Sequence, residues 1–237
     1  TLENYFYSQG REWERYAWIK SRIINFDFAT EFPQYLADFH DIVNPFVFRK
    51  YLDFGAINAM RDLHSQIRQE VIKKEMQNNI KLGVGGIREI EFIAQVFQLI
   101  RGGRYVDLQI CPTLQVLEKL QEHQFLPKNV VADLRSAYIF LRNVEHRLQY
   151  KNDQQTHSLP ENPDDLAALS KTMNFDSVEN FLQQIEQIRQ NVNEHFNTIF
   201  AEPELAESKK NNENIVENFA YFSENPQIKN ALNSEKF

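Results

Sequence analysis

The sequence predicts an all-α, bundle-like fold, and three observations lead to this prediction. Apolar residues recur at helical spacing in most segments, whereas the one extended stretch, residues 80–82, is too short to build a sheet. Prolines and glycines stand where such helices would begin and end. The chain has 237 residues, of which 42% are hydrophobic and 19 are phenylalanine, so it is long enough to bury a sizeable core.

The bulk composition argues against several classes of protein. The net charge is −7, which disfavours a dedicated nucleic-acid binder. The single cysteine, Cys111, precludes an internal disulfide and favours a reducing, cytoplasmic compartment. No apolar run reaches the length of a membrane span, and no signal peptide is recognisable. Because the first residue is Thr1 and not Met, we expect a piece of a longer protein.

Residues 1–25 are predicted to form two helical pieces that separate at Gly10. In the second piece, EWERYAWIKSRII, basic residues lie on both faces of a strongly aromatic helix. They fit an ordinary surface helix with Glu–Arg pairing along its length, or a set of cations that face a phosphate-bearing ligand. Spacing alone favours the surface helix.

Prolines mark the beginnings of most other helices. Pro33 and Pro45 each suit a first helical turn, and Asn44 is a suitable N-cap before Pro45. Pro112 and Pro127 open two further helices in the same way. Outside the glycine-rich centre, the sequence predicts helices over residues 34–43, 45–52, 54–77, 112–123, 127–151, 164–173 and 176–201.

The centre of the chain, residues 78–104, holds five of its seven glycines. They form two clusters on either side of an apolar-rich run. We predict a glycine turn at residues 83–86, a helix over 86–101 and a stop at 102–103.

The predicted central helix is apolar over most of its surface. At about 100° per residue, its polar stripe consists of Arg88, Glu91, Gln95 and Gln98. A helix of this kind is buried on most sides, so the stripe should meet a partner, a ligand or a deep cleft. Glu89 lies off the stripe in the first turn, where a carboxylate caps free N–H groups.

The glycine turn has two interpretations. Gly83, Gly85 and Gly86 could let backbone N–H groups approach an anion at a helix N-terminus, with Lys81 and Arg88 beside it. Glycine turns before helices are also common in folds without such a site. Spacing alone favours this structural interpretation.

Other motifs that would carry chemistry are not apparent in the sequence. None of the six histidines lies at zinc-ligand spacing, and the sequence has no Walker-type loop and no nucleophile elbow. Arg142, Glu145, His146 and Gln149 share one face of a predicted helix. For His146 and His157 we expect a hydrogen-bonded structural role.

Four blocks of the sequence resemble, in the same order, the motifs of one bacterial enzyme family. They are GREWERYAWIKSR at residues 10–22, KLGVGGIREIEFIAQVFQLIRGGR at 81–104, LRNVEHRLQ at 141–149 and DQQTHSLP at 153–160. The family is the glutamine synthetase adenylyltransferase/adenylyl-removing enzymes; PII uridylyltransferases share a looser glycine motif. The second block resembles the form found in the N-terminal, adenylyl-removing half.

The resemblance implies a domain organisation. In the family, a nucleotidyltransferase fold carries the metal-binding carboxylates on its sheet and precedes a helical domain. None of the carboxylate motifs occurs in this chain, and Ser21 stands where the family usually has Ala. The implied divisions are a remnant of the nucleotidyltransferase domain over residues 1–27, the helical domain over 28–202 and a polar linker or tail over 203–237.

The resemblance also implies an activity for the parent protein. The adenylyl-removing half releases AMP from a tyrosine of glutamine synthetase by phosphorolysis, giving ADP, and the other half attaches AMP from ATP. Mg²⁺ and ATP or ADP serve the parent enzyme, while a PII signalling protein and glutamine set the balance. We expect this chain alone to be inactive and to bind none of these cofactors, no nucleic acid and no membrane.

Finally, the resemblance implies one wall of a nucleotide site. Phosphoryl-type transfer depends on positioning and on cations around the phosphates. The implied wall consists of Lys81, Gly83, Gly85, Gly86, Arg88 and Glu91, supported by Arg11, Arg15, Lys20, Arg22, Glu89 and Gln95. No catalytic residue and no metal ligand is expected in the chain itself.

A non-catalytic alternative is a helical module that docks glutamine synthetase or a PII protein, with a purely structural glycine turn. The direction of the polar stripe distinguishes the two hypotheses. An open cleft beside residues 83–88 favours the nucleotide site, whereas complete burial against other helices favours a structural role.

Overall fold

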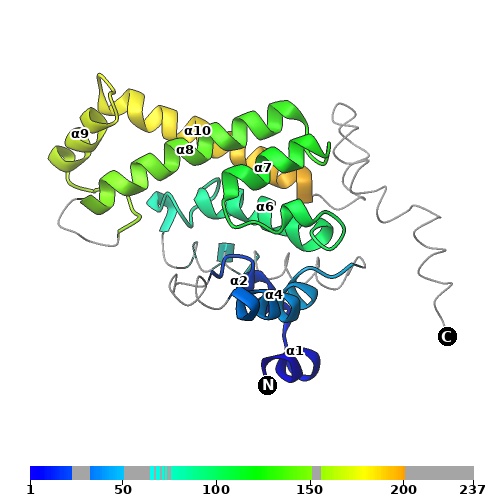
Figure 1. Ribbon diagram of the computed structural model, residues 1–237. Helices are drawn as coiled ribbons and strands as arrows, with labels where there is room; N and C mark the ends of the chain where they lie inside the picture. The colour runs from blue at the N-terminus through cyan, green and yellow to red at the C-terminus, as the bar shows by residue number, and fades with distance from the viewer. Residues whose placement is uncertain are drawn as a thin grey trace.

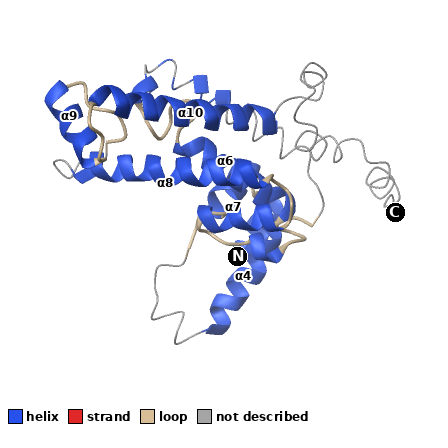
Figure 2. Ribbon diagram, turned by 90° about the horizontal axis from the view of Figure 1, so that it is seen from above, coloured by secondary structure: helices blue, strands red, loops and turns tan. Residues whose placement is uncertain are grey.

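The computed structural model describes residues 1–22, 33–50, 65–66, 68–69, 71, 73, 76–150 and 156–200. Regular structure within these residues is helical, and the one β-type pairing is an isolated bridge between Asn79 and Ser158. The all-α prediction is therefore confirmed (Figure 2). No described helix is both long and apolar enough to cross a membrane.

The helices are α1 (Leu2–Ser8), α2 (Glu12–Trp18), α4 (Pro33–Val47), α6 (Ile87–Arg101), α7 (Thr113–Glu122), α8 (Lys128–Tyr150), α9 (Pro163–Thr172) and α10 (Val178–Phe200). Short 3₁₀ turns lie at Met76–Asn78 and Val106–Leu108. The ends of α6, α7, α8, α9 and α10 agree with the predicted bounds to within two residues.

Helix α6 lies at the centre of the fold, in contact with α2, α7, α8 and α10 (Figure 1). The two long helices α8 and α10 pack along each other, and α9 joins them at one end. On the other side of α6, α4 packs against both α1 and α2. This arrangement places α6 between the N-terminal helices and the long helical pair.

Burial of α6 explains its apolar composition. Every residue from Ile87 to Leu99 except Arg88 is buried, as the sequence predicts for a helix that is apolar on most sides. The main core contains residues from α1, α2, α4, α6, α7, α8 and α10. A smaller core around Phe181 lies beneath α9. The N-terminal helices thus share the core of α6, while the predicted domain boundaries at residues 27 and 202 lie outside the described residues.

One predicted helix boundary is wrong. The sequence predicts a new helix at Pro45, but α4 continues from Pro33 through Pro45 to Val47. Because Pro45 lies in the last turn, its missing N–H interrupts little of the helix. Phe46 and Val47 are buried and hold this turn in the core. The helix predicted over residues 54–77 lies mostly outside the described residues, although those described from 65 to 73 are helical.

Candidate functional site

The glycine turn before α6 is packed directly onto α10. Gly85 has a φ of +70°, and a Cβ atom there would lie 2.0 Å from the backbone oxygen of Arg189. The side chain of Arg189 in turn donates to the Val84 carbonyl, at 2.8 Å. Gly85 is therefore needed both for its left-handed backbone and for the close approach of two backbones.

The N–H groups of the three glycines in the turn are engaged within the chain. The N–H of Gly83 donates to Asn79 O, at 2.9 Å, and the N–H of Gly86 donates to Gly83 O, also at 2.9 Å. The N–H of Gly85 donates to Glu89 Oε2, at 3.0 Å. These donors do not point at an open anion site, which favours the structural interpretation of the turn. Residues 80–82, predicted as extended, form part of this turn.

Glu89 performs the capping role that its first-turn position predicts. Besides accepting from Gly85, it accepts from Arg68 Nη2, at 2.7 Å. Arg68 also donates to Asn193 Oδ1, at 2.7 Å, and so ties the turn to α10. Glu89 thus fixes the turn and contributes no open ligand-binding surface.

The far end of the polar stripe of α6 is structural. Gln98 is buried and donates to the carbonyls of Leu108 and Ile110, each at 2.7 Å. Gln95 is 2% exposed, and neither atom of its amide has a hydrogen-bond partner among the described residues. The placement of Gln95 in an open cleft, which the resemblance implies, is therefore not found.

The near end of the stripe carries charge and meets α2 and α8. Lys20 Nζ lies 2.6 Å from Glu91 Oε2. The Tyr138 hydroxyl donates to the other carboxylate oxygen of Glu91, at 3.4 Å. The guanidinium of Arg88 lies over the ring of Tyr16, 5.0 Å from its centroid.

A second buried carboxylate, Glu145 of α8, lies close to this end. Its side chain is 2% exposed and accepts from Arg142 Nη1. Lys81 Nζ lies 3.3 Å from Glu145 Oε1, and His157 Nδ1 lies 3.0 Å from the same oxygen. Glu145 therefore gathers side chains from α8, the glycine turn and the segment before α9.

One face of α8 joins the two carboxylates. Tyr138, Arg142 and Glu145 follow the spacing of successive helical turns. The guanidinium of Arg142 lies over the ring of Tyr138, 5.4 Å from its centroid, while the Tyr138 hydroxyl reaches Glu91. The two charged centres thus form one continuous group.

We call the group of Lys20, Lys81, Arg88 and Arg142, with Glu91 and Glu145 beneath them, the cationic face. The carboxylates are buried, whereas the cations keep contact with solvent: the side chains of Lys20, Lys81 and Arg142 are 38%, 33% and 35% exposed. Four cations against two carboxylates leave an excess of two positive charges, in a chain whose net charge is −7. Such an excess attracts anions.

The pKa shifts reflect this crowding of charge. Burial lowers the pKa of Lys20, Glu91 opposes this effect, and Arg88 and Arg142 lower the pKa further. Burial would raise the pKa of Glu145, but Arg142 and Lys81 outweigh it and leave that pKa lowered. The cations are therefore close enough to repel one another, and Glu145 is held in its charged form.

The other cations named from the resemblance lie elsewhere. Arg15 is 1% exposed and donates to the Val47 carbonyl through Nε, at 3.2 Å, and Nη2, at 3.0 Å. It ties α2 to α4 and does not join the cationic face. Arg11 is exposed at the N-cap of α2. Arg22 is exposed beside a cavity of about 480 Å³ between α2, α4 and the Val106–Leu108 turn.

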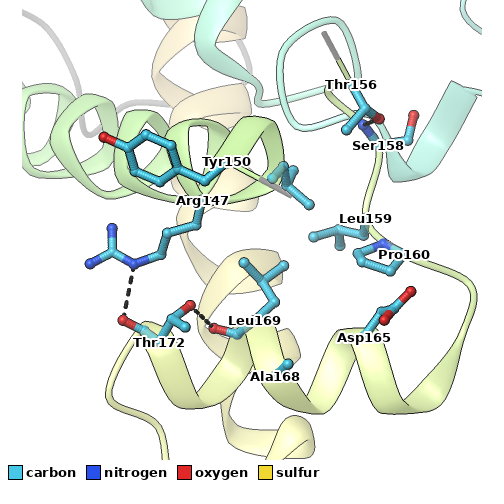
Figure 3. A pocket seen from close by; sticks show the side chains of 11 residues that line it. Arg147, Tyr150, Thr156, Ser158, Leu159, Pro160, Asp165, Ala168, Leu169 and Thr172 are labelled. Carbon is cyan, nitrogen blue, oxygen red and sulfur yellow. Dashed lines mark hydrogen bonds between the residues drawn. The ribbon is translucent and has the colours of Figure 1, made fainter. Parts of the chain in front are cut away.

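A larger cavity lies at the far end of α8. It has a volume of about 560 Å³ and is bounded by the last turns of α8, by residues 156–160 and by α9 (Figure 3). Its wall includes Arg147, which donates to the Thr172 carbonyl at 2.9 Å. Neither cavity is lined by a residue of the cationic face. The cationic face therefore lies outside both cavities.

Sequence reasoning did not assign Tyr138, Arg142, Glu145 or His157 to the site. The polar patch that contains Arg142 and Glu145 was a usable signal, because two charged residues on an otherwise core-facing helix need partners. Tyr138 carried no such signal. Its role depends on a contact with α6 that only the fold supplies.

The described residues do not offer a site for Mg²⁺. No group of three or more His, Cys, Asp or Glu side chains among them could hold a metal ion. Both carboxylates of the cationic face are already engaged by cations. Mg²⁺ prefers carboxylate oxygens together with water and phosphate, which this arrangement does not provide.

The sequence is similar to known proteins along most of its length. A family model described as GlnD PII-uridylyltransferase matches residues 58–200. The bifunctional glutamine synthetase adenylyltransferase/adenylyl-removing enzyme of Nitrosomonas eutropha is 57% identical over 200 residues, which are 84% of this chain and 21% of that protein. The enzymes of the same name from Aromatoleum aromaticum and Neisseria meningitidis serogroup B are 54% and 52% identical, over 85% and 86% of this chain and 21% and 22% of their own lengths. The chain thus spans about a fifth of the length of these relatives, and the resemblance drawn from the four blocks is confirmed.

Proposed function

Because this chain belongs to the family described as GlnD PII-uridylyltransferase, and resembles adenylyltransferase/adenylyl-removing enzymes at up to 57% identity, we propose that it is the helical part of an enzyme that removes AMP from glutamine synthetase. In the proposed reaction, an oxygen of inorganic phosphate bonds to the phosphorus of AMP-tyrosine. The bond from that phosphorus to the tyrosine oxygen breaks. ADP and the tyrosine, which takes up a proton, are the products.

The observation that carries the proposal is the cationic face. Phosphoryl-type transfer is catalysed by fixed positive groups around phosphate oxygens. Lys20 and Arg88 lie at the surface beside buried Glu91, and the side chain of Lys81, from the glycine turn, lies against Glu145. The turn itself positions these groups, since the N–H groups of its three glycines are engaged within the chain.

The metal-binding part of the reaction lies outside this proposal for the chain. Mg²⁺ and ATP or ADP would serve the parent enzyme, whose carboxylates the described residues do not supply. We therefore propose that the chain alone does not catalyse AMP removal. A PII signalling protein and glutamine are proposed as regulators of the parent on the family resemblance.

The test is Arg88→Ala in the full-length protein, assayed for release of ADP from adenylylated glutamine synthetase with phosphate. We expect a loss of about 100- to 1,000-fold in rate, because one cation that stabilises transition-state charge is removed. Lys119→Ala is a suitable control, since Lys119 pairs with Glu122 on α7, outside the cationic face. Unchanged phosphorolysis by a well-folded Arg88→Ala protein would overturn the proposal.

A further inference from the structure

The centre around Glu145 contains more positive charge than a structural ion pair requires. A buried carboxylate needs one cation for neutralisation, and removal of that partner would be strongly unfavourable. Glu145 has both Arg142 and Lys81 against it, each with about a third of its side chain exposed. Among the described residues, one of the two positive charges is thus left uncompensated at the surface.

A second cation also lies near Glu91, although an aromatic ring holds it. Lys20 pairs with the buried carboxylate, while Arg88 is half-buried over the ring of Tyr16. Burial has the largest effect on the pKa of Lys20, and Arg88 and Arg142 lower it further. The charges of both centres therefore interact with one another. Repulsion of this kind is relieved when an anion binds.

The two centres adjoin and are held rigidly. Tyr138 links them, because its hydroxyl reaches Glu91 and its ring lies under the guanidinium of Arg142. Two backbone hydrogen bonds fix the segment that carries His157. Ile80 N–H donates to His157 O, at 2.9 Å, and Leu159 N–H donates to Asn78 O, at 3.1 Å.

We infer that Arg142 and Lys81, positioned by Glu145, form a second phosphate subsite beside that of Lys20 and Arg88, so that the cationic face binds a diphosphate group. Glu145 holds Arg142 and Lys81, Glu91 and the ring of Tyr16 hold Lys20 and Arg88, and each pair of cations suits one phosphate. The planar guanidinium of Arg142 is the group best shaped for phosphate oxygens. This inference rests on the proposed function, whose product ADP carries two adjoining phosphates.

We now expect the separate chain to bind a diphosphate, although it lacks the groups for catalysis. The sequence alone does not reveal this property, because Glu145 and Arg142 meet Lys81 only in the folded chain.

The experiment is calorimetric titration of this 237-residue chain with inorganic pyrophosphate, ADP and inorganic phosphate at low ionic strength. We expect pyrophosphate and ADP to bind more tightly than phosphate. Arg142→Gln should weaken pyrophosphate binding by about tenfold or more, because a charged hydrogen bond is lost. Arg142→Lys should retain part of that affinity. Arg135→Gln is the matched control, since Arg135 is an α8 arginine that pairs with Glu118 on α7.

Glu145→Gln distinguishes positioning from net charge. If the face acted through charge alone, removal of a carboxylate would strengthen pyrophosphate binding. We expect it instead to weaken binding, because Lys81 and Arg142 lose their common anchor. Thermal melting shows whether this variant folds. If it does not, Arg142→Lys answers the same question, because it keeps the charge and removes the planar guanidinium.

The outcomes also separate this inference from the proposed function. Pyrophosphate binding that depends on Arg88 but not on Arg142 would overturn the second subsite and leave the proposed function intact. No binding of pyrophosphate at millimolar concentration would likewise overturn the inference. Normal phosphorolysis by full-length Arg88→Ala, with pyrophosphate binding still dependent on Arg142, would instead overturn the proposed function.

Discussion

The two ends of the polar stripe on α6 have similar sequence signals but different roles. Gln98 and Gln95 are buried neutral amides, and Gln98 holds the loop after α6 through two carbonyls. Arg88 and Glu91 lie at the other end, where Lys20 and Tyr138 converge on the carboxylate. The difference teaches that a polar stripe on a buried helix can combine a structural end with a binding end. Substitutions at the buried end of α6 should therefore change stability, whereas substitutions at the charged end should change ligand binding.

The largest expected effect on stability comes from the turn that positions the charged end. Gly85→Ala would place a Cβ atom 2.0 Å from the Arg189 backbone oxygen, at a φ of +70°. We expect a loss of about 3 kcal/mol or more in the free energy of unfolding, because both backbones must shift. Chemical denaturation measures the change, and Val84→Ala at the neighbouring exposed position is the control. A stability equal to that of the wild type would show that the turn is not tightly packed on α10.

Much of the fold could be predicted because glycine and proline mark the ends of its helices in the local sequence. Gly86 and Gly102 bound α6 as the sequence indicates, and α7 begins just after Pro112. The predicted helix start at Pro45 is wrong, because burial of the neighbouring Phe46 and Val47 outweighs the tendency of proline to begin a helix.

The site could be predicted only in part. Lys20 pairs with Glu91, Arg88 lies over Tyr16 and Lys81 pairs with Glu145. The nucleotide wall that the family resemblance implies stays a prediction. Arg15 lies in α2 and packs onto α4, whereas Lys20 follows the end of that helix. Helical spacing alone does not show which face of α2 is covered. Tyr138, Arg142 and Glu145 join the site through contacts between α8 and distant segments. The polar patch of Arg142 and Glu145 indicates that these residues need partners, but a single sequence does not show which distant segments supply them.

A smaller effect compares two amides of the same stripe. Gln98→Leu leaves the carbonyls of Leu108 and Ile110 without their donor, and we expect a loss of about 2 kcal/mol in the free energy of unfolding. Gln95→Leu removes a buried amide that has no partner among the described residues, so we expect no loss or a gain of about 1 kcal/mol. Both are measured by chemical denaturation, with pyrophosphate binding as a second readout that neither variant should change. Equal destabilisation by the two variants would contradict the difference in their hydrogen bonding.

The smallest expected effect concerns the pH dependence of stability at the charged end. Burial lowers the pKa of His157 below its ordinary value of 6.5, and Lys81 and Arg142 lower it further against the opposing effect of Glu145. The unfolded chain therefore binds more protons than the folded chain between the lowered pKa and 6.5, so stability falls as the pH drops through this range. Replacement His157→Gln should flatten the stability profile just below pH 6.5. Thermal melting across this range tests it, with exposed His146→Gln on α8 as the control. If His157→Gln melts with the pH profile of the wild type, burial does not keep His157 neutral in the folded chain.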